Sequence, residues 1–279
     1  MNKSELQSDH FKINLEFQEA AYCEAYYKSA PGEFREDFGL GYRELGGAAI
    51  TYAAKIDILA FNRVIGWGLN QAGDEKEVDE MIILYQDAGI KRFFVQLSPH
   101  AKPTELPQIL KDKRFYHYNN WVKFYRLVED FPASNSPLRI KQIDRRRSGI
   151  FSDIIITSFD WPDFLKPLIS APVGTPGWKH YLAYEGEVPT ACAALFLRDT
   201  FATLALAATL PQYQGRGAQS ALISRRFQDA AQAGCQWMFT ETAQETAERS
   251  VASFRNMQRH GFSIAYLRPN YLFEFDGQK

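Results

Sequence analysis

The chain has 279 residues, which is long for one compact domain and sufficient for two, since about 150 residues per domain is the usual expectation. Hydrophobic residues make up 46% of the chain and charged residues 23%, which excludes a disordered or fibrous protein. The net charge is −1, with 32 Lys and Arg against 33 Asp and Glu. We therefore expect no nucleic-acid partner and no polybasic membrane-binding surface.

Three cysteines, Cys23, Cys192 and Cys235, lie far apart, and no Cys/His spacing typical of a metal site links them to a histidine. The first residues contain no apolar segment of the kind that a signal peptide needs. No run approaches the roughly 18 apolar residues of a membrane span. We expect a cytoplasmic protein with reduced thiols, no metal and no membrane partner.

The first half contains one clear helix, predicted over residues 74–89. Asp74 is a typical N-cap, apolar residues recur at helical spacing from Val78 to Tyr85, and Gly89 stands where a left-handed C-cap is expected. A strand over 91–97, a short helix over 105–112 and a strand over 121–128 follow.

The stretch 129–137 contains two prolines, two serines and an asparagine, and it marks a domain boundary. The predicted domains are residues 1–132 and 137–279. In the second, strands are predicted at 178–184, 188–197 and 201–210. They are followed by a helix over 217–233, a strand over 236–240, a helix over 247–259 and a pair of strands ending at 275.

Antiparallel strands followed by a strand–loop–helix–strand crossover predict an α/β (α+β) mixed sheet with helices on its faces. The glycines that end the first long helix of each half, Gly89 and Gly234, are separated by nearly the same number of residues as Phe115 and Phe262. This indicates either a diverged internal duplication or a coincidence, because helix–glycine–strand units are common.

The segment 206–222 carries the most specific chemical signal. A strand ends, Pro211 stops it, and Gly215 and Gly217 precede an amphipathic helix. Glycines let successive backbone N–H groups converge, and the helix adds its unpaired N–H groups and the positive end of its dipole. The segment is therefore suited to bind a pyrophosphate.

The pattern from Gln212 through Gly215 and Gly217 to Ala218 resembles the Q/R-x-x-G-x-G/A signature of the GNAT superfamily of N-acetyltransferases. Gly261-Phe262 resembles the superfamily's downstream Gly-Phe landmark. The resemblance covers about residues 138–275 and implies a GNAT domain with an acetyl-CoA loop.

The first half is similar to a second, degenerate GNAT unit, since Gly66, Trp67 and Gly68 are followed by no such signature. The resemblance implies that each domain is a mostly antiparallel sheet with a central parallel strand pair and flanking helices. It also implies one working acetyl-CoA site.

In the superfamily, the loop binds the pyrophosphate of coenzyme A and the preceding strand pairs with the pantetheine. The alternative for the alanine-rich strand is a strand facing a crowded core. The residues that the resemblance assigns to acetyl-CoA are Ala207, Ala208, Thr209, Gln212, Gly215, Arg216, Gly217, Ala218, Gln219, Ser220 and Ser253.

Superfamily members usually let the amine attack the thioester directly in a ternary complex. Many place a tyrosine acid where this chain has Met257. Tyr271 and Asn256 are the predicted substitutes that could reach the sulfur, with Ser253 and Tyr266 as further candidates. Glu241 is the candidate base or water-positioning residue, and the alternative for it is a solvated loop carboxylate.

The leading hypothesis is an acetyl-CoA-dependent N-acetyltransferase that acts as a monomer or homodimer on a primary amine of a small molecule or peptide. The alternative is a catalytically silent module that binds coenzyme A for recognition or sensing. Transfer of a longer acyl chain is a third possibility that the residues do not separate from the first.

Overall fold

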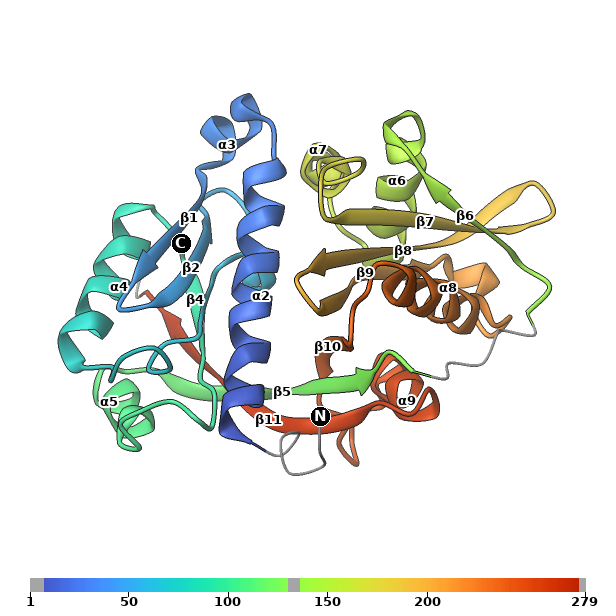
Figure 1. Cartoon of the computed structure of the whole chain (residues 1–279). Helices are drawn as coiled ribbons and strands as arrows, with labels where there is room; N and C mark the ends of the chain where they lie inside the picture. Colours follow the sequence, from blue (N-terminus) through green and yellow to red (C-terminus); the bar gives the residue numbers. More distant parts are fainter. Residues whose placement is uncertain (1–7, 130–135, 276–279) are drawn as a thin grey trace.

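The computed structural model describes residues 8–129 and 136–275. Within them the strands form one 11-stranded sheet in the order β1-β2-β3-β4-β11-β5-β10-β9-β8-β7-β6 (Figure 1). The strands are β1 (Leu40–Leu45), β2 (Ala48–Ala53), β3 (Arg63–Ile65), β4 (Arg92–Gln96), β5 (Tyr116–Leu127), β6 (Arg139–Ile143), β7 (Trp178–Glu185), β8 (Val188–Arg198), β9 (Phe201–Thr209), β10 (Trp237–Ala243) and β11 (Ser263–Glu274).

Two strand pairs in this sheet are parallel, β3 with β4 and β9 with β10, and the other neighbours are antiparallel. In each parallel pair a helix connects the strands: α4 (Glu75–Asp87) in the first half and α8 (Ala218–Gln232) in the second. The predicted fold class, a mixed sheet with a parallel pair in each half, is confirmed. The structure adds that the two sheets are joined into one.

The halves are joined by an exchange of long strands. β11, from the end of the chain, lies between β4 and β5 of the first half, and β5 pairs in turn with β10 of the second half. The prediction of a strand pair ending at 275 is therefore wrong. Pro269 and Asn270 resemble turn residues, but β11 passes through them as one strand whose register shifts at Asn270 absorb the irregularity.

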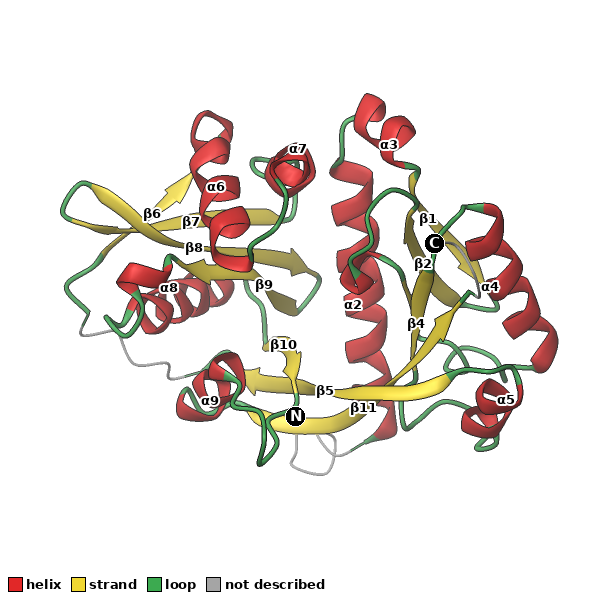
Figure 2. Cartoon of the chain, turned by 180° about the vertical axis from the view of Figure 1, so that it is seen from behind, coloured by secondary structure: helices red, strands yellow, loops and turns green. Residues whose placement is uncertain are grey.

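The helix α2 (Asp9–Ser29) was not predicted, and it stands between the two halves (Figures 1 and 2). Glu16, Gln18 and Glu19 are buried on it, so its inward face lacks the apolar periodicity that predicts a helix. Tyr26 and Tyr27 belong to a core cluster that also contains Ile155 and Leu168 of the second half. The halves therefore share part of one hydrophobic core.

The remaining helices cover both faces of the sheet. In the second half, α8 packs on one face of β7 to β9 and α6 packs on the other (Figure 2). The helices not yet given are α3 (Gly32–Phe38), α5 (Leu106–Asp112), α6 (Ser148–Phe159), α7 (Lys166–Ser170) and α9 (Ala252–Arg259), with 3-10 turns at Leu59–Phe61, Arg145–Arg147, Asp163–Leu165 and Pro211–Tyr213. In the described ranges no helix combines the length and apolar character needed to cross a bilayer.

The helix predicted over 74–89 is confirmed. Asp74 accepts a hydrogen bond from the Glu77 N–H, Glu77 accepts one from the Asp74 N–H, and Gly89 has φ +70°. The helix predicted over 247–259 begins only at Ala252, because Glu245 accepts hydrogen bonds from the Val251 N–H and the Arg255 side chain and holds the preceding residues in a turn.

The predicted boundary between residues 132 and 137 lies largely in 130–135, outside the described residues. The division into 1–132 and 137–279 stays a prediction. Because β5 and β11 each pair across it and the core is shared, experiments on the site require the full chain.

Candidate active site

The parallel strands β9 and β10 separate from each other at the predicted site. They pair only from Phe201 to Thr203 on β9 and from Trp237 to Phe239 on β10. Beyond this, β9 pairs with β8 and β10 pairs with β5 on their outer edges. The Thr240 hydroxyl donates a 3.0 Å hydrogen bond to the Leu204 carbonyl where the strands part. An opening therefore forms between two inner strand edges that no longer pair with each other.

The loop that leads into α8 requires glycine for its backbone conformation. Gly215 has φ +78° and Gly217, the N-cap of α8, has φ +82°. A Cβ at Gly215 would meet nothing within 4 Å, so the positive φ, and not crowding, selects glycine there. The first turn of α8 contains no acidic residue, and a glycine cap has no side chain to occupy its N–H groups. The positive end of α8 is thus open to an anion.

The corresponding position in the first half is closed. Carboxylates of Asp74 and Glu77 cap the N-terminus of α4. The buried Trp67 donates a 2.7 Å hydrogen bond to Glu77, and a Cβ at Gly73 would collide with the Trp67 ring. Two carboxylates at this helix start would repel a pyrophosphate. The start of α4 is therefore unsuited to bind a pyrophosphate.

A cavity of about 730 Å³ extends from the strand opening to the start of α8 and to α9. Its lining includes most of the residues that the sequence assigned to acetyl-CoA and two of the three assigned to catalysis. These are Ala207, Ala208, Thr209, Gly215, Gly217, Ala218, Gln219, Ser220, Ser253, Glu241 and Asn256. Gln219 donates a 3.0 Å hydrogen bond to the Thr209 hydroxyl, which ties the strand to the helix start. Met257 also lines the cavity.

Three of the predicted site residues, Gln212, Arg216 and Tyr271, do not line this cavity, and neither does the further candidate Tyr266. Arg216 turns to Glu185 at 2.8 Å and donates to the carbonyl of Gln212. Tyr271 lies on the part of β11 that pairs with β4, among the apolar side chains of the first half. Sequence order placed Tyr271 near the sulfur, but the strand exchange carries it away, so we do not assign it a catalytic role.

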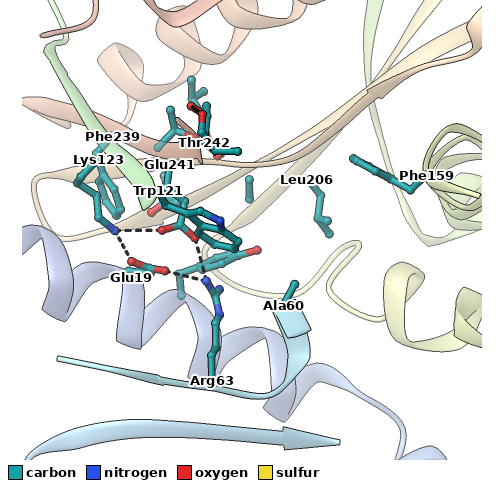
Figure 3. A pocket seen from close by; sticks show the side chains of 16 residues that line it. Glu19, Ala60, Arg63, Trp121, Lys123, Phe159, Leu206, Phe239, Glu241 and Thr242 are labelled. Carbon is teal, nitrogen blue, oxygen red and sulfur yellow. Dashed lines mark hydrogen bonds and ion pairs between the residues drawn. The ribbon is translucent and has the colours of Figure 1, made fainter. Parts of the chain in front are cut away.

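A second cavity of about 320 Å³ adjoins the first, and the two share Phe159, Leu204–206 and Thr240–242 in their linings. The other wall of the second cavity comes from the first half (Figure 3). The residues of that wall are Glu19, Tyr22, Ala60, Arg63, Trp121 and Lys123. The degenerate half therefore builds one side of a space that opens onto the strand gap.

Glu241 lies in both linings, within β10, and forms ion pairs on both carboxylate oxygens. Its Oε1 accepts a 2.9 Å hydrogen bond from Arg63, and its Oε2 accepts from Arg268 and, at 3.4 Å, from Lys123. The Glu241 side chain is 21% exposed. It is therefore neither a fully solvated loop carboxylate nor a free base: to take a proton it must give up part of an ion pair.

The same three cations also contact Glu19, a buried carboxylate on α2. Glu19 accepts from Arg63 at 3.0 Å, from Arg268 at 2.6 Å and from Lys123. Burial alone would raise the pKa of Glu19, but Arg268, Lys123 and Arg63 hold it well below its ordinary value.

Glu16 completes this group, at 2.8 Å from Arg268 and 2.6 Å from the Tyr266 hydroxyl. Tyr266, a sequence candidate for the sulfur, is thus engaged inside the protein. We call the six charged residues Glu16, Glu19, Arg63, Lys123, Glu241 and Arg268 the junction network. Three carboxylates oppose three cations, so the network is neutral.

Sequence reasoning predicted only Glu241 of the junction network and missed its other five members and the whole wall from the first half. A signal was present in the strands, because Lys123 interrupts an apolar run and Arg63 precedes one. A charged residue at a buried strand position needs a partner. In the part of the chain that the structure describes, no three His, Cys, Asp or Glu side chains are grouped to hold a metal ion.

Comparison with known proteins identifies the fold that carries this site. No protein-family profile and no curated protein matches the chain. Among solved structures, a GCN5-related N-acetyltransferase from Kribbella flavida is similar over 91% of this chain and 96% of its own, with a TM-score of 0.62 and 14% identity. The chain has a two-domain GNAT fold.

Two further GNAT structures agree. A GCN5-related N-acetyltransferase from Sphaerobacter thermophilus has a TM-score of 0.60 at 13% identity, over 91% of this chain and 93% of its own. A tandem GNAT protein from the clavulanic acid biosynthesis pathway has a TM-score of 0.58 at 9% identity, over 85% and 82%. At these identities the likeness is one of fold, and the two-domain GNAT arrangement predicted from the sequence is confirmed.

Proposed function

We propose that this protein is a cytoplasmic N-acetyltransferase that moves an acetyl group from acetyl-CoA to a primary amine. The observation that carries the proposal is that the two cavities adjoin and share part of their lining. An open helix N-terminus lies at one end of the strand gap, and a separate, partly charged cavity adjoins it through Glu241 and its neighbours. This is the arrangement that a ternary complex of donor and acceptor requires.

The larger cavity fits coenzyme A. Backbone N–H groups of residues 215–220 would hold the pyrophosphate at the positive end of α8. The inner edge of β9 at 207–209 would pair with the pantetheine amides, and the small side chains of Ala207 and Ala208 permit a close approach. Ser253 and Asn256 face the same space from α9. Acetyl-CoA supplies the activated acetyl group.

The acceptor would lie in the smaller cavity. Its amine nitrogen forms a bond to the acetyl carbon, the carbon–sulfur bond breaks, one amine proton leaves, and the thiolate gains a proton. We propose that Glu241 accepts a hydrogen bond from the amine, or from a water that takes its proton, since it lies in both linings. Ser253 and Asn256 remain the proposed hydrogen-bond donors toward the sulfur.

One observation favours a second function. Met257 lines the cavity at the position where many superfamily members have a tyrosine acid. A chain without that acid could bind coenzyme A as a silent recognition module.

A transfer assay separates the two functions. Purified full-length protein is incubated with acetyl-CoA and single primary amines, and both free thiol and N-acetylated amine are quantified. We expect both products in equal amounts, and neither with the Gly217→Glu variant. Coenzyme A binding without either product, across amines of all charge types, would support the silent module.

A further inference from the structure

Among the described residues, the lining of the small cavity offers an amine one partly exposed carboxylate. Of the two carboxylates in its lining, Glu19 is 3% exposed and Glu241 is 21% exposed. Among the described residues, Glu241 Oε1 accepts a hydrogen bond only from Arg63, and a carboxylate oxygen has two lone pairs. One N–H of an acceptor can therefore bind at Oε1 without displacing an existing ion pair.

The remaining charges in the wall are already engaged. Arg63 donates to Glu19, Gln96, Glu241 and the sulfur of Cys23. Since the junction network is neutral, a second ammonium would lie near Arg63 and Lys123 with no free carboxylate. A substrate carboxylate would find Arg63 and Lys123 already paired with Glu19 and Glu241, and the one Arg63 nitrogen that has no partner among the described residues, Nε, is itself buried. Either extra charge would lose its hydration without a partner.

Most of the remaining side chains in the lining are apolar or aromatic, and its uncharged polar groups are the hydroxyls of Tyr22, Thr203, Thr240 and Thr242. Trp121 lies near the charged residues, with the Arg63 guanidinium 5.6 Å from its ring, and Leu206 and Phe159 lie at the far end (Figure 3). Phe159 is 46% exposed although it lines both cavities, and it stacks on Trp161. An exposed aromatic side chain at this place can cover an apolar group of an acceptor.

The volume of the small cavity limits the size of the acceptor. A cavity of about 320 Å³ is near the lower end of the range for small-molecule sites, about 300–1,000 Å³. An acceptor with several rings would not fit inside it.

We infer that the acceptor is a small primary amine with a single amino group, no carboxylate and a flat apolar body, of the arylalkylamine type. Its nitrogen contacts Glu241, and its apolar body lies between Trp121 and Phe159. This inference rests on the proposed transferase function and names the substrate class for the same site.

The test is a matched panel with full-length enzyme: 2-phenylethylamine, propylamine, phenylalanine and spermidine. 2-Phenylethylamine and phenylalanine share a ring and differ by a carboxylate, whereas propylamine shares the charge and lacks the ring. We expect kcat/KM to be highest for 2-phenylethylamine, with phenylalanine and spermidine at least about ten-fold lower, the effect of leaving one charge imperfectly paired.

The variant Phe159→Ala tests the apolar contact. It should reduce the preference for 2-phenylethylamine over propylamine by about three- to ten-fold. Phe164→Ala is the control, because Phe164 is similarly exposed (43%), stacks on Phe38 and does not line the cavity. The control should keep the wild-type preference.

Preferred transfer to spermidine or phenylalanine, or an unchanged preference in Phe159→Ala, would overturn the substrate class and leave the transferase function standing. No transfer to any amine by protein that binds coenzyme A would overturn the transferase function and the substrate class together.

Discussion

Glu19 is predicted to stabilise the junction between the halves more than any exposed charge on the same helix. Its side chain is 3% exposed, and it accepts hydrogen bonds from Arg63, Lys123 and Arg268. Glu19→Gln leaves three buried cations with two carboxylates. Removal of one partner from a buried ion pair costs about 3–5 kcal/mol, so we expect a loss of this size in the free energy of unfolding.

The matched control is Glu24→Gln, also on α2. Glu24 pairs with Lys28 one turn away, and both side chains are at least one-third exposed. An exposed pair of this spacing contributes about 0.3–0.5 kcal/mol. The assay is urea unfolding of the full chain, followed by tryptophan fluorescence and circular dichroism, at pH 7 and at decreasing pH.

The stabilising contribution of Glu19 should decrease at low pH. Because the folded-state pKa of Glu19 is held below its unfolded value near 4.3, its contribution is complete above that value and is lost as pH falls through the folded pKa. The difference in the free energy of unfolding between wild type and Glu19→Gln should therefore decrease below about pH 4. A Glu19→Gln loss no larger than that of Glu24→Gln would refute the account of the network.

Three further predictions concern single side chains. Burial lowers the pKa of His180 to about 3, so the free energy of unfolding should fall by up to about 1.4 kcal/mol per pH unit as the pH drops below about 6.5. The variant His180→Leu should remove this slope, and equal slopes in the two proteins would contradict the prediction. Glu241→Gln should lower kcat/KM for transfer by roughly 10²–10⁴-fold, with less loss as pH rises because more amine arrives deprotonated. A wild-type rate from about pH 6 to 9 would remove Glu241 from the mechanism. Tyr271→Phe should leave transfer unchanged, since Tyr271 lies outside both cavities, and a large kinetic defect would contradict its position.

The parts of the structure that the sequence predicted are those set by local chemistry. The loop before α8 combines a strand end, Pro211 and two glycines within a few residues, and each of these has a direct backbone consequence. The helix that begins after Asp74 has both its caps and its apolar period in one segment. Such signals depend only on residues that are close together in the sequence.

The acceptor wall could not be predicted in this way. Glu19, Arg63, Trp121 and Glu241 come from separate elements, and only the strand exchange and the placement of α2 bring them together. The charges on the buried face of α2 also hid the helix itself, because their ion-pair partners lie on β3, β5 and β11. Position along the chain likewise misplaced Tyr271, since it says nothing about which strand β11 pairs with.

Titration calorimetry of the full chain measures whether the start of α8 is the coenzyme A site. Gly217 and Gly234 lie just before and just after α8 with φ of +82° and +77°, and no atom lies within 3.4 Å of a Cβ built at either, so a glutamate imposes similar backbone strain at both. We predict one coenzyme A per chain for wild type and Gly234→Glu, and no binding for Gly217→Glu. Equal affinity in the two variants, or two molecules bound per chain, would contradict the account.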